Sequence, residues 1–393
     1  MFSIFSLASS VLVFFVLATS FSSFVSASTD WYKVVSNPIV NYFTGQPFVN
    51  SPFNYPLSGF VDYQDKTARA GFGIGLHQDP APTDNAIAYD NGPAYYNFIG
   101  NLPSPVAYPY FARLATVGTG DRVYGFFQTQ SDPNTLFAYY SDVADYYGGP
   151  IYGFNSWNTS SPVLIYNDEF DQIEQISVTT LNDGTIYIAI ENAVDGAVHL
   201  ISTNDFVTFT DEGQFIPANS AQPITAYDGT SVFAGKNPAD PAGPEILWFH
   251  WIDAATGVPY ISYTSQAQPQ VLNVPFIEIG NVTLKTQLGV TAAVSVDGST
   301  AMLLRVGSTQ GSAQTLTIYY SLFNTKTMTV IQDETQLVGL DGTIPQIGAA
   351  GNGAMPTIIS SRYAGDAIKG KPVVVAWANV GDRNIYSLAG SPY

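Results

Sequence analysis

A short β-strand phrase recurs along this 393-residue chain at intervals of roughly 60 residues. Each copy is a run of apolar and aromatic residues that ends in Ser, Thr or Asp. The copies are AIAYD ending at Asp90, FAYYS ending at Ser141, VHLIS ending at Ser202, YISYT ending at Thr264, TIYYS ending at Ser321 and IYS ending at Ser387. A module that is copied several times predicts a repeat architecture, in which each copy buries its apolar surface against its neighbours.

One module, from Ile176 to Thr210, shows most clearly what each copy is expected to form. Its apolar runs are separated by Asp-Gly pairs, which favour tight turns between antiparallel strands. Strands are expected at Ile176–Leu181, Ile186–Glu191, Val198–Thr203 and, as an outer edge, Phe206–Thr210, with turns at Asp183-Gly184 and Asp195-Gly196. Four antiparallel strands in sequence order form one blade of a β-propeller.

The sequence therefore predicts an all-β protein, a β-propeller of six four-stranded blades. Five or seven blades remain alternatives, because the copy that ends at Asp90 is looser than the others. Residues 28–393 are expected to form this single domain. A strand near Ile39–Phe43 is expected to pair with the last blade, since a ring without such closure would leave unpaired strand edges.

Residues 1–27 have the pattern of a signal peptide. Val11–Leu17 is an apolar run between Ser-rich flanks, and Val25-Ser26-Ala27 predicts cleavage after Ala27. An uncleaved anchor is the alternative, although the run is shorter than the roughly 20 residues that cross a bilayer. We expect a secreted protein, extracellular or in a cell wall, glycosylated at the sequons of Asn158 and Asn281.

Charge and aromatic content narrow the classes of partner. The formal net charge is −18, and the 13 Lys and Arg residues are scattered, so neither nucleic acid nor an anionic membrane is an expected partner. The aromatic content of 14% and the many Asp, Asn and Gln residues suit glycans, whose rings stack on aromatic faces while their hydroxyls accept and donate hydrogen bonds. No cofactor is expected. The three histidines, His77, His199 and His250, are too far apart in sequence to indicate a metal site.

The run RVYGFFQ from Arg122 to Gln128, followed by a strand with Tyr139, resembles the repeat of fungal fucose-binding lectins, which are six-bladed propellers. The resemblance implies that Arg122 binds sugar hydroxyls, with Tyr124, Gln128 and Tyr139 beside it. The other repeats carry Ile or Ala where this one has Arg. The alternative is an ordinary solvent-facing Arg at the start of a strand.

A set of carboxylates is also similar to the catalytic set of propeller glycosidases of the arabinanase and xylosidase type. Asp79 before Pro80, Asp171 (or Asp168) and Glu245 after Gly243-Pro244 would be the base, the pKa modulator and the general acid. Two carboxyl groups must flank the scissile bond in such an enzyme. The alternative is that Asp79 and Glu245 are solvated loop residues.

Two further motifs, an aromatic run and a Ser-Asp-Thr phrase, bear on how the strands pack. Alternation along Trp248-Phe249-His250-Trp251 places aromatic rings on both faces, which predicts burial between two blades. If the strand end is open, Trp248 or Trp251 would stack on a sugar. The phrase STNDFVTFT from Ser202 to Thr210 resembles the Ser-x-Asp-x-x-x-Trp/Phe-Thr phrase of sialidase and arabinanase blades, and we interpret it as a signature of the fold.

These observations favour a secreted, lectin-like propeller that binds glycans or cell-wall polysaccharide in pockets between blades, as fungal lectins do. The first alternative is a secreted glycoside hydrolase with a carboxylate set in the central funnel. The second is an extracellular scaffold or interaction protein, which would present one loop face to protein partners.

Overall fold

The computed structural model describes sixteen stretches of the chain. They are residues 30–33, 57–62, 69–74, 86–90, 96–101, 111–119, 122–129, 132–142, 163–166, 173–280, 286–295, 297–309, 315–348, 356–360, 373–379 and 385–393. The expected signal peptide at 1–27, Ile39–Phe43, Asp79, Asp168, Asp171 and both sequon asparagines, Asn158 and Asn281, lie outside these stretches. The described stretches contain no helix able to span a bilayer.

The described strands form six sheets, which we number in chain order. The first sheet contains β2 (Leu57–Asp62), β3 (Arg69–Ile74), β4 (Ala86–Asp90) and β5 (Tyr96–Asn101). The second contains β6 (Phe111–Thr119), β7 (Arg122–Thr129), β8 (Asp132–Asp142) and β9 (Val163–Tyr166). The third contains β10 (Ile173–Thr180), β11 (Ile186–Asn192), β12 (Val198–Thr203) and β13 (Thr210–Gln214).

The fourth and fifth sheets have short additional strands, and the sixth sheet contains the N-terminal strand β1. The fourth contains β15 (Ala226–Asn237), β16 (Asp240–Asp253) and β17 (Pro259–Ser265), with β18 (Gln268–Leu272), β14 (Ile216–Pro217) and β19 (Ile277–Glu278) outside them. The fifth contains β20 (Thr286–Val294), β21 (Thr300–Ser308), β22 (Thr315–Asn324), β23 (Thr329–Gln336) and β24 (Ile347–Gly348). The sixth contains β25 (Thr357–Ser360), β26 (Val373–Ala378), β27 (Ile385–Gly390) and β1 (Tyr32–Lys33).

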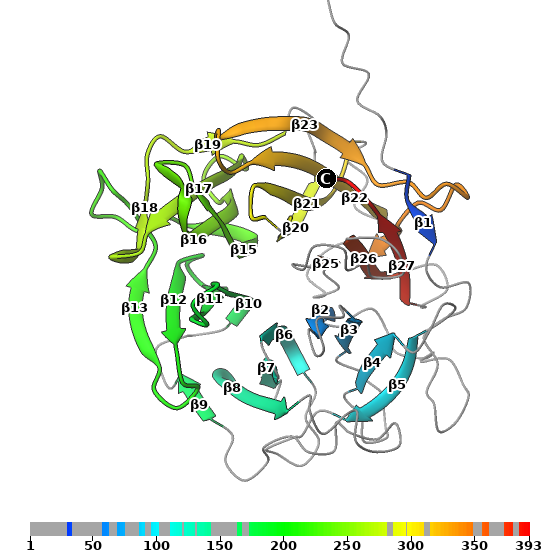
Figure 1. The fold of residues 1–393 in the computed structure, drawn as a ribbon, viewed down its shortest axis with the longest axis horizontal. Helices are drawn as coiled ribbons and strands as arrows, with labels where there is room; N and C mark the ends of the chain where they lie inside the picture. The colour runs from blue at the N-terminus through cyan, green and yellow to red at the C-terminus, as the bar shows by residue number, and fades with distance from the viewer. Residues whose placement is uncertain are drawn as a thin grey trace, which may run out of the picture.

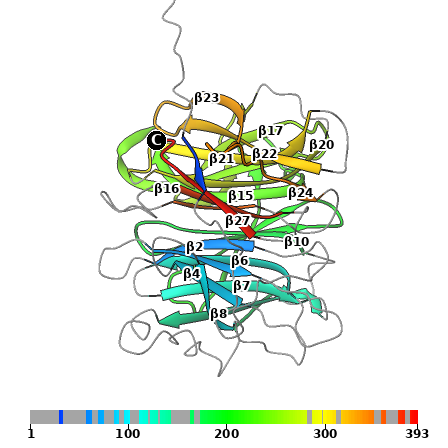
Figure 2. The ribbon, with the colours of Figure 1, turned by 90° about the vertical axis from the view of Figure 1, so that its right-hand side faces the viewer.

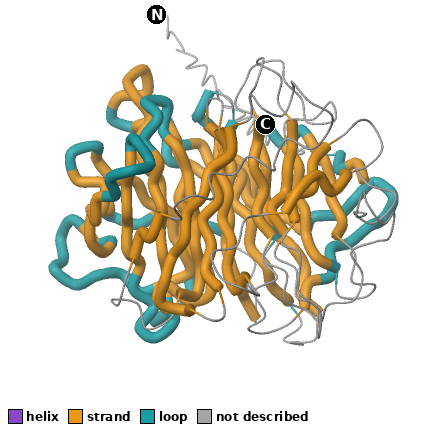
Figure 3. The backbone as a smooth tube through the Cα atoms, turned by 90° about the horizontal axis from the view of Figure 1, so that it is seen from below, coloured by secondary structure: helices purple, strands orange, loops and turns teal. Residues whose placement is uncertain are grey.

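The sheets stand around a common axis, which confirms the predicted all-β propeller (Figure 1). The inner strands β2, β6, β10, β15, β20 and β25 lie next to one another in chain order, and β25 returns to β2. Every copy of the recurring phrase lies in the third strand of its sheet, that is, in β4, β8, β12, β17, β22 or β27. The side views show strands that run from one face of the ring toward the other (Figures 2 and 3).

Composition changes from the inside of a sheet to its edge. β11, with the sequence IYIAIEN, is buried along its whole length, because neighbouring sheets cover both of its faces. β13, with the sequence TDEGQ, is exposed or partly exposed throughout. Polar and charged residues on an outer strand discourage pairing with another chain.

The turn after β12 differs from the prediction. The expected strand at Phe206–Thr210 is wrong, and the fourth strand of this sheet is β13, which begins at Thr210. The Asp205 carboxylate instead accepts hydrogen bonds from the amides of Val207 and Thr208, and Phe206 has a φ of 57°. Phe206 is 4% exposed, so the STNDFVTFT phrase forms a turn that drives an aromatic ring into the core.

Closure of the ring by an N-terminal strand is confirmed, but the strand is β1, which pairs with β27. Trp31, beside β1, is 2% exposed. Its ring lies 5.7 Å from the ring of Tyr320 in the fifth sheet, and a Cβ on Gly390 would overlap it. The N-terminal segment therefore joins the fifth and sixth sheets through one large side chain.

The predicted burial of both faces of the Trp248–Trp251 strand is confirmed. Trp248 packs 5.6 Å from Phe323 of the fifth sheet, measured between ring centroids. On the other face, Phe249 stacks at 4.3 Å on Phe215, which follows β13, and at 5.0 Å on Trp251. Alternation along β16 thus supplies aromatic cover to both neighbouring sheets.

Candidate functional site

In every sheet the inner strand pairs antiparallel with the second strand, and it runs from one face of the ring to the other (Figure 2). We call the face where the inner strands begin the proximal face and the opposite one the distal face. β10 and β15 run the same way, since Gln175 and Ser177 contact Thr230 and Val232 in that order.

Four neighbouring inner strands are irregular close to their proximal ends. Pairing with the second strand skips Ala112 in β6, Glu174 in β10, residues 227–229 in β15 and Gly289 in β20. Bulges of this kind turn side chains away from the regular ladder and are frequent beside active sites. The proximal end of the axis is therefore the candidate functional site.

Acidic residues occupy two adjacent bulges. Glu174 lies in the β10 bulge and is partly exposed. Asp228 lies in the β15 bulge; its backbone position is described, and its side chain lies outside the described part. A third acidic residue, Glu191 at the proximal end of β11, is 1% exposed and pairs in register with Gln175. The strands thus bring three acidic positions to one end of the propeller.

The β15 bulge also carries an aromatic ring and a close backbone contact. Tyr227 is 53% exposed, which is high for a large ring next to the axis. A Cβ on Gly229 would overlap the backbone of Gly289, so only glycine lets β15 and β20 approach this closely. An exposed aromatic ring can stack on the apolar face of a sugar.

Gln175 connects three of the inner strands. Its Oε1 accepts a hydrogen bond from the amide of Thr230 at 3.2 Å, and its Nε2 donates to the carbonyl of Val290 at 3.4 Å. Two residues further along, the Ser177 hydroxyl accepts a hydrogen bond from the amide of Val232 at 3.0 Å. Side chains of β10 therefore satisfy backbone groups on the open edges of β15 and β20.

A separate buried polar cluster involves the fourth and fifth sheets. Arg305 of β21 forms an ion pair with Glu334 of β23, and both are nearly inaccessible to solvent. Burial lowers the pKa of Arg305, and the charge of Glu334 opposes that shift. Burial and the nearby charge of Arg305 lower the pKa of His250, in β16, to about 3. A buried neutral His beside a closed ion pair fits a structural role better than proton transfer.

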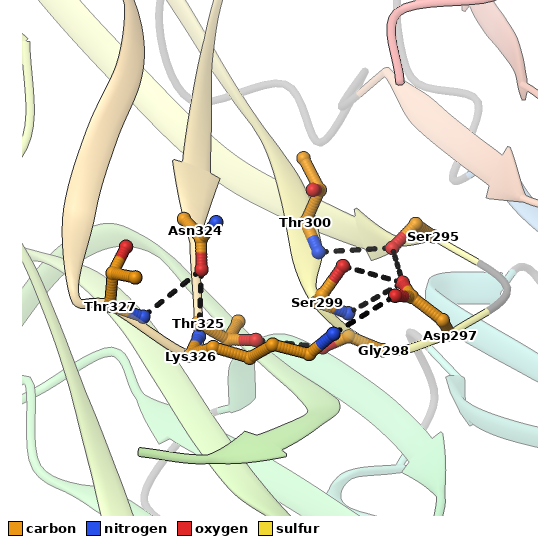
Figure 4. A network of polar contacts seen from close by, with 9 residues as sticks. All are labelled: Ser295, Asp297, Gly298, Ser299, Thr300, Asn324, Thr325, Lys326 and Thr327. Atoms are coloured by element: carbon orange, nitrogen blue, oxygen red, sulfur yellow. Dashed lines mark hydrogen bonds and ion pairs between the residues drawn. The ribbon is translucent and has the colours of Figure 1, made fainter. Parts of the chain in front are cut away.

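The part of the distal face that the structure describes carries capped turns, one of them between β20 and β21. Asp297 lies between β20 and β21, and its carboxylate accepts hydrogen bonds from Ser295 and Ser299 (Figure 4). It also forms an ion pair with Lys326, which lies in the turn after β22. Although partial burial acts to raise the pKa of Asp297, these hydrogen bonds lower it. Among the described residues, no group of three or more Asp, Glu or His is placed to hold a metal ion.

The predicted aromatic ligand contacts lie in the core. Trp248 and Trp251 are 0% exposed, so the prediction that either stacks on a sugar is wrong. Tyr124 is 8% exposed and packs 4.6 Å from the ring of Phe206. Packing of neighbouring sheets covers both faces of these strands. The sequence pattern within a strand does not determine whether such rings are exposed.

The other predicted site residues are placed only in part. Arg122 and Gln128 lie in β7 and Tyr139 in β8, and their side chains lie outside the described part. Asp79 and Asp171 lie outside it altogether. Glu245 is 4% exposed in β16, opposite Lys236 and near Gly298, toward the distal face. The structure does not bring Glu245 to the bulges.

Sequence reasoning missed Glu174, Gln175 and the role of the β15 bulge. The strand predicted from the sequence begins at Ile176, whereas β10 begins at Ile173 and includes Glu174 and Gln175. Asp228-Gly229 inside an inner strand was a usable signal, because a Gly within a strand often marks a bulge. The proximity of Glu174 to that bulge had no signal in the local sequence.

No family model matches this sequence, and no curated protein matches it either. Solved structures do match. The Penicillium chrysogenum α-L-arabinanase in complex with arabinobiose covers 92% of this chain and 97% of its own, with 13% identity and a TM-score of 0.53. The phage phi92 endosialidase covers 92% of this chain and 69% of its own, with 10% identity and a TM-score of 0.60. At these identities the likeness shows the propeller fold. Both matches are named as enzymes that act on glycans, which contradicts the predicted lectin function.

Proposed function

We propose that the protein is a glycoside hydrolase whose catalytic carboxyl groups come from Glu174 and Asp228 at the proximal face. The observation that carries the proposal is the position of two acidic residues in the bulges of adjacent inner strands. This replaces the lectin prediction and supports the hydrolase alternative, with a carboxylate set different from the one expected.

Hydrolysis adds water across the bond between the anomeric carbon and the glycosidic oxygen. One carboxylic acid gives its proton to the departing oxygen. The other carboxylate either takes a proton from the attacking water or bonds to the anomeric carbon until water releases it. Glu174 and Asp228 supply two such groups from neighbouring strands, and Tyr227 supplies an apolar face for a sugar ring.

Two further features support a glycan substrate outside the cell. Propellers named as an arabinanase and an endosialidase share this architecture over most of the chain. Residues 1–27 have the pattern of a secretory leader. Export is part of the proposal.

The test measures hydrolysis by the purified protein on 4-nitrophenyl α-L-arabinofuranoside, 4-nitrophenyl β-D-xylopyranoside, linear arabino-oligosaccharides and polysialic acid. Glu174→Gln and Asp228→Asn are each expected to lower kcat by about 10²–10⁴-fold, because each removes one acid or base group. Glu278→Gln, an exposed carboxylate on the outer strand β19, is the control and is expected to keep wild-type rates. Wild-type-like rates in both bulge variants would reject the assignment.

A further inference from the structure

We infer that Gln175 is a positioning residue that holds the bulges of β10, β15 and β20 in a fixed arrangement. The inference rests on the proposed function, because it concerns how the site is held for catalysis. Its basis is the two hydrogen bonds of one side-chain amide to two other inner strands.

The three residues that these bonds join occupy equivalent places. Gln175 directly follows Glu174, the skipped residue of β10. Thr230 directly follows the skipped residues 227–229 of β15, and Val290 directly follows Gly289, the skipped residue of β20. The amide therefore links the first regularly paired residue after each bulge, which is the point where each irregular segment is anchored to its sheet.

The chemistry of an amide suits this position. The edge of each inner strand that faces the axis has no partner strand, so its backbone donors and acceptors need other partners. Thr230 offers a donor and Val290 an acceptor. Gln supplies one acceptor and one donor at the end of a single side chain, whereas an ionised Glu can only accept. Gln175→Glu therefore keeps at most the bond from Thr230.

Removal of the Gln175 amide is expected to displace the two acidic residues, because both lie close to it in sequence or through Thr230. Glu174 is the residue next to Gln175, and Asp228 lies two residues before Thr230. A misplacement of a catalytic group by 1 Å costs on the order of 10²-fold in rate. Without the amide, the bulges keep their covalent connections but lose the bonds that set their distance from one another.

Ser177 provides a matched control on the same strand. It also accepts a hydrogen bond from a β15 amide, that of Val232, but it lies beyond the bulge. Ser177→Ala and Gln175→Ala thus each remove side-chain bonds from β10 to a neighbouring inner strand. Only the second removes the link between bulges.

The experiment compares Gln175→Ala, Gln175→Glu and Ser177→Ala in the full chain, with the member of the substrate panel that the wild type hydrolyses fastest. For Gln175→Ala, kcat is expected to fall by about 100-fold with KM within about threefold of wild type. Gln175→Glu is expected to lower kcat by a smaller factor than Gln175→Ala. Ser177→Ala is expected to lower kcat by less than about threefold. Equal losses in Gln175→Ala and Ser177→Ala, or no loss in Gln175→Ala, would overturn the inference.

Amide hydrogen exchange separates this inference from the proposed function. Gln175→Ala is expected to speed exchange at the Thr230 amide, and Ser177→Ala at the Val232 amide instead. If the wild type hydrolyses no member of the panel, the proposed function fails. The exchange result still decides the link itself, and unchanged exchange at Thr230 in Gln175→Ala overturns it.

Discussion

Buried ionisable side chains make the stability of the ring depend on their charge state. His250 is fully buried, and Arg305 and Glu334 are buried as an ion pair. Breaking such a pair by removing one partner typically costs 3–5 kcal/mol, because the other charge stays buried without compensation. Each group is thus held neutral or neutralised, and the stability of the fold depends on its charge state.

The acid sensitivity of the protein should depend on His250. The folded-state pKa is about 3, below the ordinary value of 6.5, so between these pH values the unfolded chain binds a proton that the folded chain does not. Stability is therefore fully present above pH 6.5 and is lost as the pH falls, by about 1.4 kcal/mol per unit.

Chemical unfolding of the wild type and of His250→Leu between pH 7 and pH 4 measures this contribution. Below pH 6.5 the variant should lose stability less steeply on acidification than the wild type, by about 1.4 kcal/mol per pH unit. An identical slope in both proteins would show that His250 is not the group responsible.

Two tight turns connect successive strands of the third sheet. The predicted turns at Asp183-Gly184 and Asp195-Gly196 are confirmed, with glycine φ values of 90° and 71°. In both turns the Asp carboxylate accepts a hydrogen bond from the amide two residues ahead. Gly196 also accepts a hydrogen bond from the amide of Ala226 at 2.8 Å, so this turn packs on the start of β15.

The two glycines allow backbone strain to be separated from packing between sheets. Gly184→Ala should cost roughly 1–2 kcal/mol, because a left-handed φ is unfavourable for Ala and nothing lies within 4 Å of the added methyl group. Gly196→Ala should cost clearly more, since its Cβ would overlap the Ala226 carbonyl. Equal changes in the denaturation midpoint of the two variants would contradict this.

The whole ring depends on closure by a very short strand. β1 has two residues, and the buried Trp31 beside it contacts both the fifth and the sixth sheets. Without β1, the edge of β27 would have no partner strand. Closure therefore depends on a two-residue strand and on the large buried side chain beside it.

Trp31→Ala should lower the free energy of unfolding by about 3–5 kcal/mol, as is usual for truncation of a buried aromatic residue. Phe215→Ala, which removes an equally buried ring between the third and fourth sheets, is the matched control. Only the Trp31 variant should show faster hydrogen exchange in β27. If exchange in β27 is equally slow in both variants, Trp31 does not close the ring.

The sequence by itself determined the blade. The recurring phrase marked the third strand of every sheet, and the Asp-Gly turns were placed correctly. These features are local: a two-residue alternation and a left-handed glycine are specified by neighbours in the chain. The strand predicted at Phe206–Thr210 is wrong because hydrogen bonds from the backbone to the Asp205 side chain compete with strand pairing.

Only the tertiary structure decided where the candidate site lies. Glu174 and Asp228 are far apart in sequence, and their positions come to one end of the ring because the starts of β10 and β15 lie side by side in adjacent sheets. Likewise, Trp248 and Trp251 are removed from solvent by the sheets on either side of β16. Burial and convergence are set by contacts between modules, which the pattern within one module does not contain.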